Sequence, residues 1–220
     1  AHGTSHQFVS ERAAEMLGKP LDELKIITLH LGNGASITAV ENGVSIDTSM
    51  GFTPLAGVTM GTRTGDIDAS LIPYLMEKLD LTDVQDMIDI FNHQSGLKGL
   101  SGVSSDMRDL EAAEAEGNER AELALRIFED RVRNYVGQYI VKMEGVDALV
   151  FTAGIGENAP ETRANIIKNL EFMGIKLDEE KNNVRGEERV ISTDDSTAKI
   201  LLIPTDEEIM IARDVERLKK

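Results

Sequence analysis

The chain contains no cysteine among its 220 residues. This absence excludes disulfide bonds, thiolate metal sites and thiol nucleophiles, and it is typical of a protein kept in a reducing compartment. The chain also lacks any run of about 18 consecutive apolar residues, so we expect no transmembrane helix. Its first residues show neither the basic nor the apolar segment of a secretory signal, which favours a cytoplasmic location.

Basic residues are scarce as well. The 23 lysines and arginines stand against 39 acidic residues, which leaves a formal net charge of −16. A protein that binds nucleic acid needs a basic face for the phosphates, so this acidic net charge excludes a general nucleic-acid binder. A local anion site is still compatible with it, because backbone N–H groups or a few arginines suffice. The hydrophobic fraction of 41% and the 19 glycines are those of an ordinary globular chain.

Apolar spacing predicts an α/β domain. Three short strands over 25–31, 35–40 and 44–49 follow one another through tight turns, and Asn42-Gly43 is a strong hairpin signal. Further strands are expected over 146–152, 189–192 and 199–204. Helices are expected over 5–17, 67–79, 83–94, 106–116, 119–144, 160–173 and 206–218. This order predicts a mixed sheet with helices packed on it.

Local signals predict where some of these elements begin and where loops lie. A capping box of Thr82 and Gln85 is expected to start the helix over 83–94. Thr205 with Glu208 is expected to do the same for the last helix. The segments 51–66 and 95–105 are rich in glycine and small polar residues, which predicts loops.

Two glycine-rich turns follow apolar strands. Gly32-Asn33-Gly34 joins two strands, and its glycines let backbone N–H groups approach an anion closely. It is neither a Rossmann fingerprint nor a Walker A loop, because a strand follows it and no Gly-Lys-Ser/Thr does. The second turn, AGIGEN at 153–158, opens a helix and aims free N–H groups at a ligand. Each has a plain alternative: a simple hairpin turn, or a strand-to-helix turn capped by Asn158.

Two such turns after apolar strands, with an opening three-strand meander, match actin-like and sugar-kinase-like ATPases. The similarity becomes specific in colinear segments that span nearly the whole chain. They are HGTSH (2–6), LHLGNGAS (29–36), DTSMGFTPLAGVTMGTRTGDID (47–68), SSDMR (104–108), FTAGIGEN (151–158) and PTDEE (204–208). Together they resemble the C-terminal half of the acetate kinase family.

The resemblance implies a ribonuclease H-like, actin-like α/β fold with a mixed sheet flanked by helices. It also implies direct in-line phosphoryl transfer between ATP and acetate, which gives acetyl phosphate and ADP with the help of Mg²⁺. The expected partners are adenine nucleotide and acetate or acetyl phosphate, and the expected assembly is a homodimer. No nucleic acid or membrane partner is expected.

Two catalytic residues follow from the resemblance. Arg63 matches the arginine that contacts the transferred phosphoryl group, a task that suits its planar five-donor fork. A surface ion pair with Asp66 or Asp68 is the plain alternative. His2 matches the histidine that hydrogen-bonds the phosphoryl group in the transition state, and His6 is expected to orient the site or pack beside it.

The remaining site residues are carried over in the same way. His30 matches a phosphate-contacting histidine, with a buried structural role as the alternative, and His93 is expected only to end a helix. Pro54 matches an apolar wall of the acetate pocket, and Glu207 matches a glutamate implicated in Mg²⁺ handling. The other nucleotide-binding residues implied are Asn33 and Gly34 in the phosphate loop, and Asp106, Met107, Arg108, Gly154, Ile155 and Asn158 in the adenosine pocket. Met107 replaces an aromatic residue, and its thioether side chain can still cover a base.

Two departures from the family pattern limit the expectation. Ala1 stands where the family has a phenylalanine, so one wall of the acetate site is absent. The N-terminal half of the family protein has no counterpart, so residues 1–220 are expected to be the C-terminal domain alone. Such a fragment is expected to bind adenine nucleotide weakly and to turn over little.

Several alternatives stay open at this point. The first is an assembly domain whose main work is dimerisation, without nucleotide binding of its own. A second is a kinase for propionate or butyrate, because one methylene changes binding by only about 1–3 kcal/mol. A third is an actin-like or chaperone-like ATPase, which the HGTSH and MGTRTGD segments do not fit.

Overall fold

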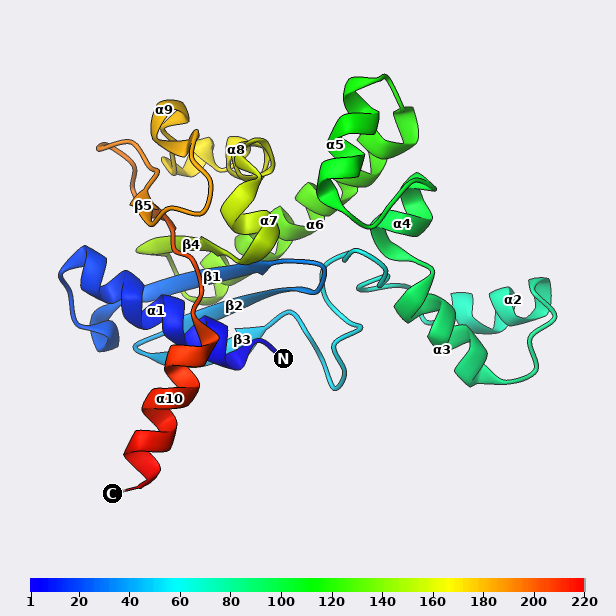
Figure 1. The fold of residues 1–220 in the computed structure, drawn as a ribbon, viewed down its shortest axis with the longest axis horizontal. Coiled ribbons are helices and arrows are strands. Elements are labelled where there is room, and N and C mark those ends of the chain that lie inside the picture. Colours follow the sequence, from blue (N-terminus) through cyan, green and yellow to red (C-terminus); the bar gives the residue numbers. More distant parts are fainter. Residues whose placement is uncertain (220) are drawn as a thin grey trace. The chain divides into compact units, whose positions relative to one another are not determined.

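A computed structural model describes residues 1–219 and divides them into two compact units (Figure 1). The sheet unit comprises residues 1–32 and 36–48 together with the described residues from Val132 onward. The helical unit comprises residues 33–35 and 49–131.

The sheet unit is built on a six-stranded mixed sheet in the order β3-β2-β1-β4-β6-β5. The neighbours β1, β4 and β6 pair in parallel, whereas β2 with β3 and β5 with β6 are antiparallel. Figure 1 shows the first three strands as consecutive neighbours, as the expected meander requires. The strands are β1 (Lys25–Leu31), β2 (Ala35–Glu41), β3 (Val44–Thr48), β4 (Ala148–Thr152), β5 (Arg189–Val190) and β6 (Lys199–Leu202).

The turn between β2 and β3 has the expected hairpin geometry. Asn42 and Gly43 both have positive φ, 52° and 78°, as a type I′ turn demands of its two central residues. Asparagine and glycine are the residues that adopt this conformation most readily. The local sequence therefore determines this hairpin.

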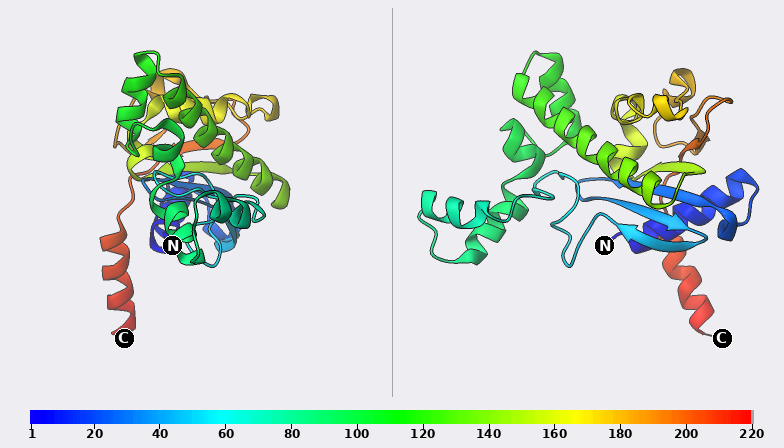
Figure 2. Two further views of the ribbon diagram at one scale, coloured as in Figure 1. Left: turned by 90° about the vertical axis from the view of Figure 1, so that its right-hand side faces the viewer. Right: turned by 180° about the vertical axis from the view of Figure 1, so that it is seen from behind.

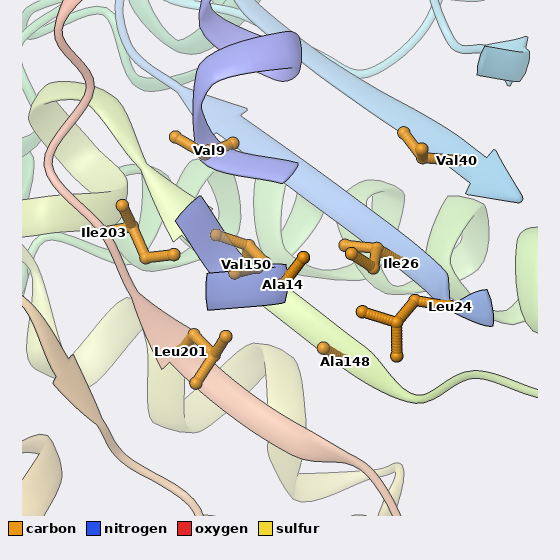
Figure 3. Packing of buried hydrophobic residues seen from close by; sticks show 10 residues of the cluster. Val9, Ala14, Leu24, Ile26, Val40, Ala148, Val150, Leu201 and Ile203 are labelled. Carbon is orange, nitrogen blue, oxygen red and sulfur yellow. The ribbon is translucent and has the colours of Figure 1, made fainter. Parts of the chain in front are cut away.

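The hydrophobic core of the sheet unit lies between α1 (Gly3–Leu17) and one face of the sheet (Figure 3). Val9 and Ala14 on α1 meet Ile26, Val150 and Leu201 from the central strands β1, β4 and β6. The central strands read as nearly continuous apolar runs, which is typical of parallel strands covered on both faces. Consistent with this, the alternate residues of these strands are fully buried too: Ile27, Leu29, Leu149, Phe151, Ile200 and Leu202.

The other helices of the sheet unit follow its parallel strands. In the views of Figure 2, α10 extends away from the sheet. The helices are α7 (Ala153–Asn158), α8 (Pro160–Lys168), α9 (Glu179–Asn182) and α10 (Glu207–Leu218), with short 3₁₀ turns at Leu21–Glu23 and Glu171–Met173. The long helix α6 (Glu119–Lys142) begins in the helical unit and ends in the sheet unit.

The helical unit contains α2 (Leu71–Lys78), α3 (Val84–His93), α4 (Gly96–Ser101) and α5 (Met107–Ala115). Before them, residues 51–66 form the ordered loop that the sequence predicts. Asp66 closes it, because its backbone N–H donates to the Gly57 carbonyl at 2.8 Å and its carboxylate accepts from the Gly57 N–H at 2.9 Å. Gly65 is required within this loop, since its φ is +69° and a Cβ there would lie 2.4 Å from the Gly57 oxygen.

Two helix starts in the helical unit correct the sequence prediction. The helix expected from residue 67 begins at Leu71, because the Asp68 carboxylate instead accepts hydrogen bonds from the Ser70 backbone and hydroxyl. The expected Thr82 capping box is wrong as well. Asp83 caps α3 by accepting from the Gln85 N–H at 2.9 Å.

Three other segments differ from the prediction. The expected loop over 95–105 contains the short helix α4, and the AGIGEN turn is itself the short helix α7. The last helix is capped by Asp206, which accepts from the Ile209 N–H, and not by Thr205 with Glu208. The Thr205 hydroxyl donates to Ser5 instead. Short glycine-containing helices carry too little periodicity to be recognised in a sequence.

Candidate functional site

In the sheet unit, the carboxyl ends of three parallel strands meet at one edge. His30 near the end of β1 pairs with Thr152 at the end of β4, and Phe151 pairs with Leu202 at the end of β6. Ligands of open α/β sheets bind outside the carboxyl ends of the strands. The residues that follow these strands are therefore the first candidates for a binding site.

Three histidines gather at this edge. The rings of His2 and His30 stack with their centroids 3.8 Å apart, and the His6 ring lies 6.1 Å from His30 and 6.3 Å from His2. His2 precedes α1 in the left-handed region, with φ 56°. A non-glycine residue held there is a strained feature of the kind that clusters at functional sites. The structure thus brings together the predicted residues His2 and His30, with His6 beside them.

Hydroxyl groups hold these rings. The Ser36 Oγ lies 2.9 Å from Nδ1 of His2 and 2.7 Å from Nε2 of His6. On the other side of the cluster, the Ser5 Oγ lies 2.8 Å from Nδ1 of His30. Each ring is therefore tied to a serine of α1 or β2.

Burial sets the protonation of two of these rings. Loss of hydration, together with the nearby rings of His30 and His2, lowers the pKa of His6 to about 3. Burial likewise lowers the pKa of His30 to about 4, with a contribution from His2. Both rings are neutral at physiological pH. This arrangement is compatible with both predicted roles of His30, the buried structural role and the phosphate contact. A neutral imidazole ring still has one N–H that it can donate to a phosphate.

The predicted residues Gly154, Ile155 and Asn158 all lie in α7, directly after β4. Ala153 opens this helix with φ 65°, and its N–H donates to the Glu157 carboxylate at 2.8 Å. The same carboxylate accepts from the Thr205 N–H at 3.2 Å, so Glu157 joins the segments that follow β4 and β6. Asn158 donates its side-chain amide to the Gly154 carbonyl at 2.9 Å.

A buried arginine supports α7 from beneath. Arg163 is fully buried, and its guanidinium donates to the Gly156 carbonyl, to the Asn182 side chain and carbonyl, and to the Val184 carbonyl, each at 2.8 Å. Burial lowers the pKa of Arg163 to about 10. This side chain fixes the glycine-rich helix to the polar segment that contains α9.

In the helical unit, Asn33, which precedes Gly34 in the chain, lies against Gly61. The Gly61 N–H donates to the Asn33 carbonyl at 3.0 Å. A Cβ on Gly61 would fall 2.0 Å from the Asn33 side-chain oxygen, so only glycine fits there without moving Asn33. Asn33 of the predicted phosphate loop and the MGTRTGD loop are therefore in direct contact.

The same loop places Arg63 beside Pro54. The Arg63 guanidinium is half-buried and donates to the Pro54 carbonyl at 3.3 Å, with the Met60 sulfur 3.7 Å away. The carboxylates of Asp66 and Asp68 accept the loop and turn hydrogen bonds described above. The predicted catalytic arginine and the predicted acetate-pocket proline are brought together.

The Asp106-Met107-Arg108 segment starts α5. The Asp106 carboxylate accepts from the Arg108 N–H at 2.9 Å and pairs with its guanidinium at 2.6 Å, and these bonds lower the pKa of Asp106 to about 2. Met107 is buried and Arg108 is exposed. His93 is the last residue of α3, as expected.

The residues present fit Mg²⁺ only as a companion of a phosphate ligand. Glu207 is exposed in the first turn of α10, and among the side chains that the structure describes no three acidic or histidine residues form a metal cluster. Mg²⁺ is commonly held by one or two carboxylates together with substrate phosphates. The exposed carboxylate of Glu207 could supply the one protein ligand that such a phosphate-bound Mg²⁺ needs.

Four residues of the sheet unit site have no place in the sequence prediction: Ser5, Thr28, Ser36 and Glu157. Ser5 and Ser36 lie inside the HGTSH and LHLGNGAS segments, so their place in these histidine-containing motifs is a usable signal. Thr28 and Glu157 act through contacts that only the folded chain creates. Among the described residues, no helix is both long enough and apolar enough to cross a bilayer.

Comparison with known proteins agrees with this geometry. The sequence model of the acetokinase family matches residues 1–213. Acetate kinase of Enterococcus faecalis is 66% identical over 219 residues, which are 100% of this chain and 55% of that protein. Acetate kinase of Bacillus subtilis is 60% identical with the same coverage. The chain spans about half the length of these curated relatives.

Solved structures show the same fold. Acetate kinase of Porphyromonas gingivalis superposes with a TM-score of 0.97 at 48% identity, over 100% of this chain and 55% of its own. A propionate kinase of Francisella tularensis superposes with a TM-score of 0.90 at 46% identity, over 97% and 54%. The expected α/β class, with a mixed sheet flanked by helices, is confirmed. This chain belongs to the acetokinase family.

Proposed function

We propose that the chain is the C-terminal half of an acetate kinase, which transfers a phosphoryl group between ATP and acetate to give acetyl phosphate and ADP. The observation that carries the proposal is the match of the family model to residues 1–213. The histidine cluster, the glycine helix and the Arg63 loop are the local features that support it. A cytoplasmic location is part of the proposal, and the absence of cysteine is compatible with it.

The proposed chemistry depends on neutralising negative charge. Phosphoryl transfer requires positioning and stabilisation of charge spread over the phosphoryl oxygens. Arg63 is proposed to supply a guanidinium fork, and His2 and His30 are proposed to supply ring N–H groups. Mg²⁺, when bound with the nucleotide near Glu207, would add positive charge at the phosphates.

The nucleotide is proposed to rest on two sets of residues. Asn33 and Gly34 offer an amide and backbone N–H groups to the phosphates. Gly154, Ile155 and Asn158 on α7, and separately Asp106, Met107 and Arg108, are proposed to contact the adenosine. Pro54 is proposed as an apolar wall for the methyl group of acetate.

A chimera tests the activity. The matching segment of Enterococcus faecalis acetate kinase is replaced by this chain, and acetyl phosphate is trapped as the hydroxamate. The chimera is expected to be active, and Arg63→Ala is expected to lower kcat by about 10²–10³-fold, as loss of one charge-stabilising donor does. Arg126→Ala, at an exposed position of α6, is the matched control with unchanged kcat. A folded chimera that makes no acetyl phosphate would contradict the proposal.

The same assay determines which carboxylic acid is the preferred substrate. Acetate, propionate and butyrate are compared by kcat/KM, because the similarity to a propionate kinase leaves this choice to the pocket. One methylene changes the ratio by about 10- to 200-fold. Acetate is expected to be preferred, and a higher kcat/KM for propionate would reassign the substrate.

Calorimetry and light scattering of the chain itself test the alternative of an assembly domain. The chain is expected to bind ADP weakly, to lose that binding in Asn158→Ala and to keep it in Arg63→Ala. It is also proposed to form a homodimer. A dimer that binds no ADP would favour assembly as its main function.

A further inference from the structure

The Glu157 carboxylate joins two segments that leave neighbouring strands of the sheet unit. Its Oε1 atom accepts the backbone N–H of Ala153 at 2.8 Å and the backbone N–H of Thr205 at 3.2 Å. Ala153 is the first residue after β4, and Thr205 follows β6, the parallel neighbour of β4. One oxygen atom therefore connects the carboxyl ends of two adjacent strands. We call Glu157, Ala153 and Thr205 the carboxylate bridge.

The bridge supplies an acceptor that the local backbone cannot supply. The first N–H groups of a helix have no partner within the helix, and Ala153 is the first residue of α7. Its φ of 65° is a costly conformation for alanine, which persists only where the surrounding structure fixes it. Hydrogen bonds to a carboxylate are stronger than those to a neutral acceptor. The bond to Glu157 is therefore suited to hold the start of α7.

Thr205 extends the bridge to two further parts of the site. Its hydroxyl oxygen lies 2.8 Å from the Ser5 Oγ, which lies 2.8 Å from Nδ1 of His30. Its chain neighbour Asp206 caps α10, whose first residue is Glu207. The position of Thr205 is therefore tied to α7, to the histidine cluster and to the first turn of α10.

The backbone of Glu157 is itself held in place. Its carbonyl accepts from the Gly186 N–H at 3.0 Å. The preceding carbonyl, that of Gly156, accepts from the fully buried Arg163 at 2.8 Å. Because the backbone is fixed, the length of the Glu157 side chain sets the separation between α7 and Thr205.

We propose that Glu157 is a positioning residue that sets the spacing between α7 and the segment 205–207, so that Asn158 and Glu207 meet one nucleotide–magnesium complex in register. The ligand part of this statement rests on the proposed function, in which Asn158 contacts the adenosine and Glu207 the Mg²⁺. The spacing itself is a property of the free protein. Glu157 acts through its neighbours in the chain and across the bridge, and not by contact with the ligand.

Amide hydrogen exchange of the full chain, resolved by residue with NMR, tests the bridge without any ligand. Glu157→Ala removes the acceptor, so exchange of the Ala153 and Thr205 amides is expected to rise together, by about tenfold or more. Glu157→Gln retains an oxygen at the same reach and is expected to restore most of the protection. Glu161→Ala, the same change at an exposed position in the first turn of α8, is the matched control with unchanged exchange at both amides.

Two results of this measurement would overturn the bridge. The first is faster exchange at Ala153 alone in Glu157→Ala, because Thr205 would then be held by another acceptor. The second comes from Glu157→Asp, which keeps the charge, shortens the side chain by one methylene and replaces Glu157→Ala if that variant does not fold. It is expected to expose at least one of the two amides, and full protection of both would show that side-chain length does not set the spacing.

The chimera of the proposed function tests the positioning role. In Glu157→Ala, the KM for ATP and the Mg²⁺ concentration that gives half the maximal rate are each expected to rise about tenfold, as loss of a group that orients ligand residues does. Glu157→Gln is expected to restore both values, and Glu161→Ala to leave them unchanged. A Glu157→Ala chimera that melts earlier but keeps both values would show a merely structural role and overturn the proposal.

The bridge and the proposed function can fail separately. If the chimera with the natural chain makes no acetyl phosphate while both amides are protected by Glu157, the proposed function is lost and the bridge stands. If the chimera is active and Glu157→Ala leaves both amides protected, the bridge is lost and the proposed function stands.

Discussion

Burial keeps His6 and His30 neutral, which makes the stability of the sheet unit depend on pH. An unfolded histidine takes up its proton near the ordinary pKa of 6.5, whereas the folded pKa values are about 3 and about 4. Between these values the unfolded chain binds more protons than the folded chain. The free energy of unfolding is therefore complete above pH 6.5 and falls as the pH falls towards 4.

Denaturant unfolding at several pH values measures this linkage. Each buried histidine contributes a slope of up to about 1.4 kcal/mol per pH unit between pH 6.5 and 5. His30→Gln is expected to reduce the slope by about one proton, because glutamine does not titrate. His93→Gln, at an exposed helix end, is expected to leave it unchanged. Equal slopes in both variants would show that burial of His30 does not cause the linkage.

Arg163 is the residue on which α7 most depends. Its guanidinium is the donor for four oxygen acceptors of α7 and of the segment around α9, and it is fully buried. Arg163→Met keeps much of the volume but leaves these acceptors without their donor. We expect a loss of roughly 3 kcal/mol in unfolding free energy, since the cost of unsatisfied buried groups exceeds the desolvation recovered by removing the charge.

Thermal and denaturant unfolding check this value. Arg126→Met on the exposed face of α6 is the matched control, and it is expected to change stability by less than about 0.5 kcal/mol. Hydrogen exchange is expected to rise first in α7 and α9. A loss below about 1 kcal/mol in Arg163→Met would mean that the Arg163 bonds are not needed to hold α7.

At the scale of elements, helix starts test how local signals compete. Thr82 and Asp83 are both residues that cap helices, and the folded chain uses Asp83. Asp83→Ala is expected to cost about 1 kcal/mol, whereas Thr82→Ala is expected to stay within about 0.5 kcal/mol. Asp83→Asn retains an acceptor and is expected to behave like the natural chain. A larger loss in Thr82→Ala than in Asp83→Ala would restore the capping box.

The elements also show what a sequence can and cannot predict. β1 is predicted with its observed bounds, because a seven-residue segment with four large apolar residues between turn signals leaves little choice. α4 and α7 were missed because six residues with two glycines give no helical period. The cap of α10 was assigned one residue early, because Thr205 is recruited by Ser5, which lies 200 residues away in the chain.

At the scale of the whole molecule, the acidic balance excludes one class of partner. With a net charge of −16, the chain is expected not to bind duplex DNA even at low ionic strength, because phosphate contacts require a basic face. Fluorescence anisotropy of labelled duplex DNA at rising protein concentration measures this. An anisotropy rise that salt reverses would contradict the expectation.

The same charge is compatible with a nucleotide, because the cationic and N–H donors are concentrated locally. Arg63 in the helical unit, and His30 with α7 in the sheet unit, each lie in loops or strand ends that the sequence singled out. The net charge of the whole chain therefore does not predict whether one local site binds an anion.

The sequence by itself determined the family and the succession of the main strands along the chain, and it supplied the hypothesis for the site residues, because colinear motifs and apolar periodicity are local properties that survive without the fold. Only the tertiary structure decided which other groups form hydrogen bonds to the predicted site residues and to the segments that carry them. Thr28, Ser36, Glu157 and Arg163 act through bonds that bridge separate strands and helices. Such bonds depend on the burial of both partners, and burial exists only once the chain is folded.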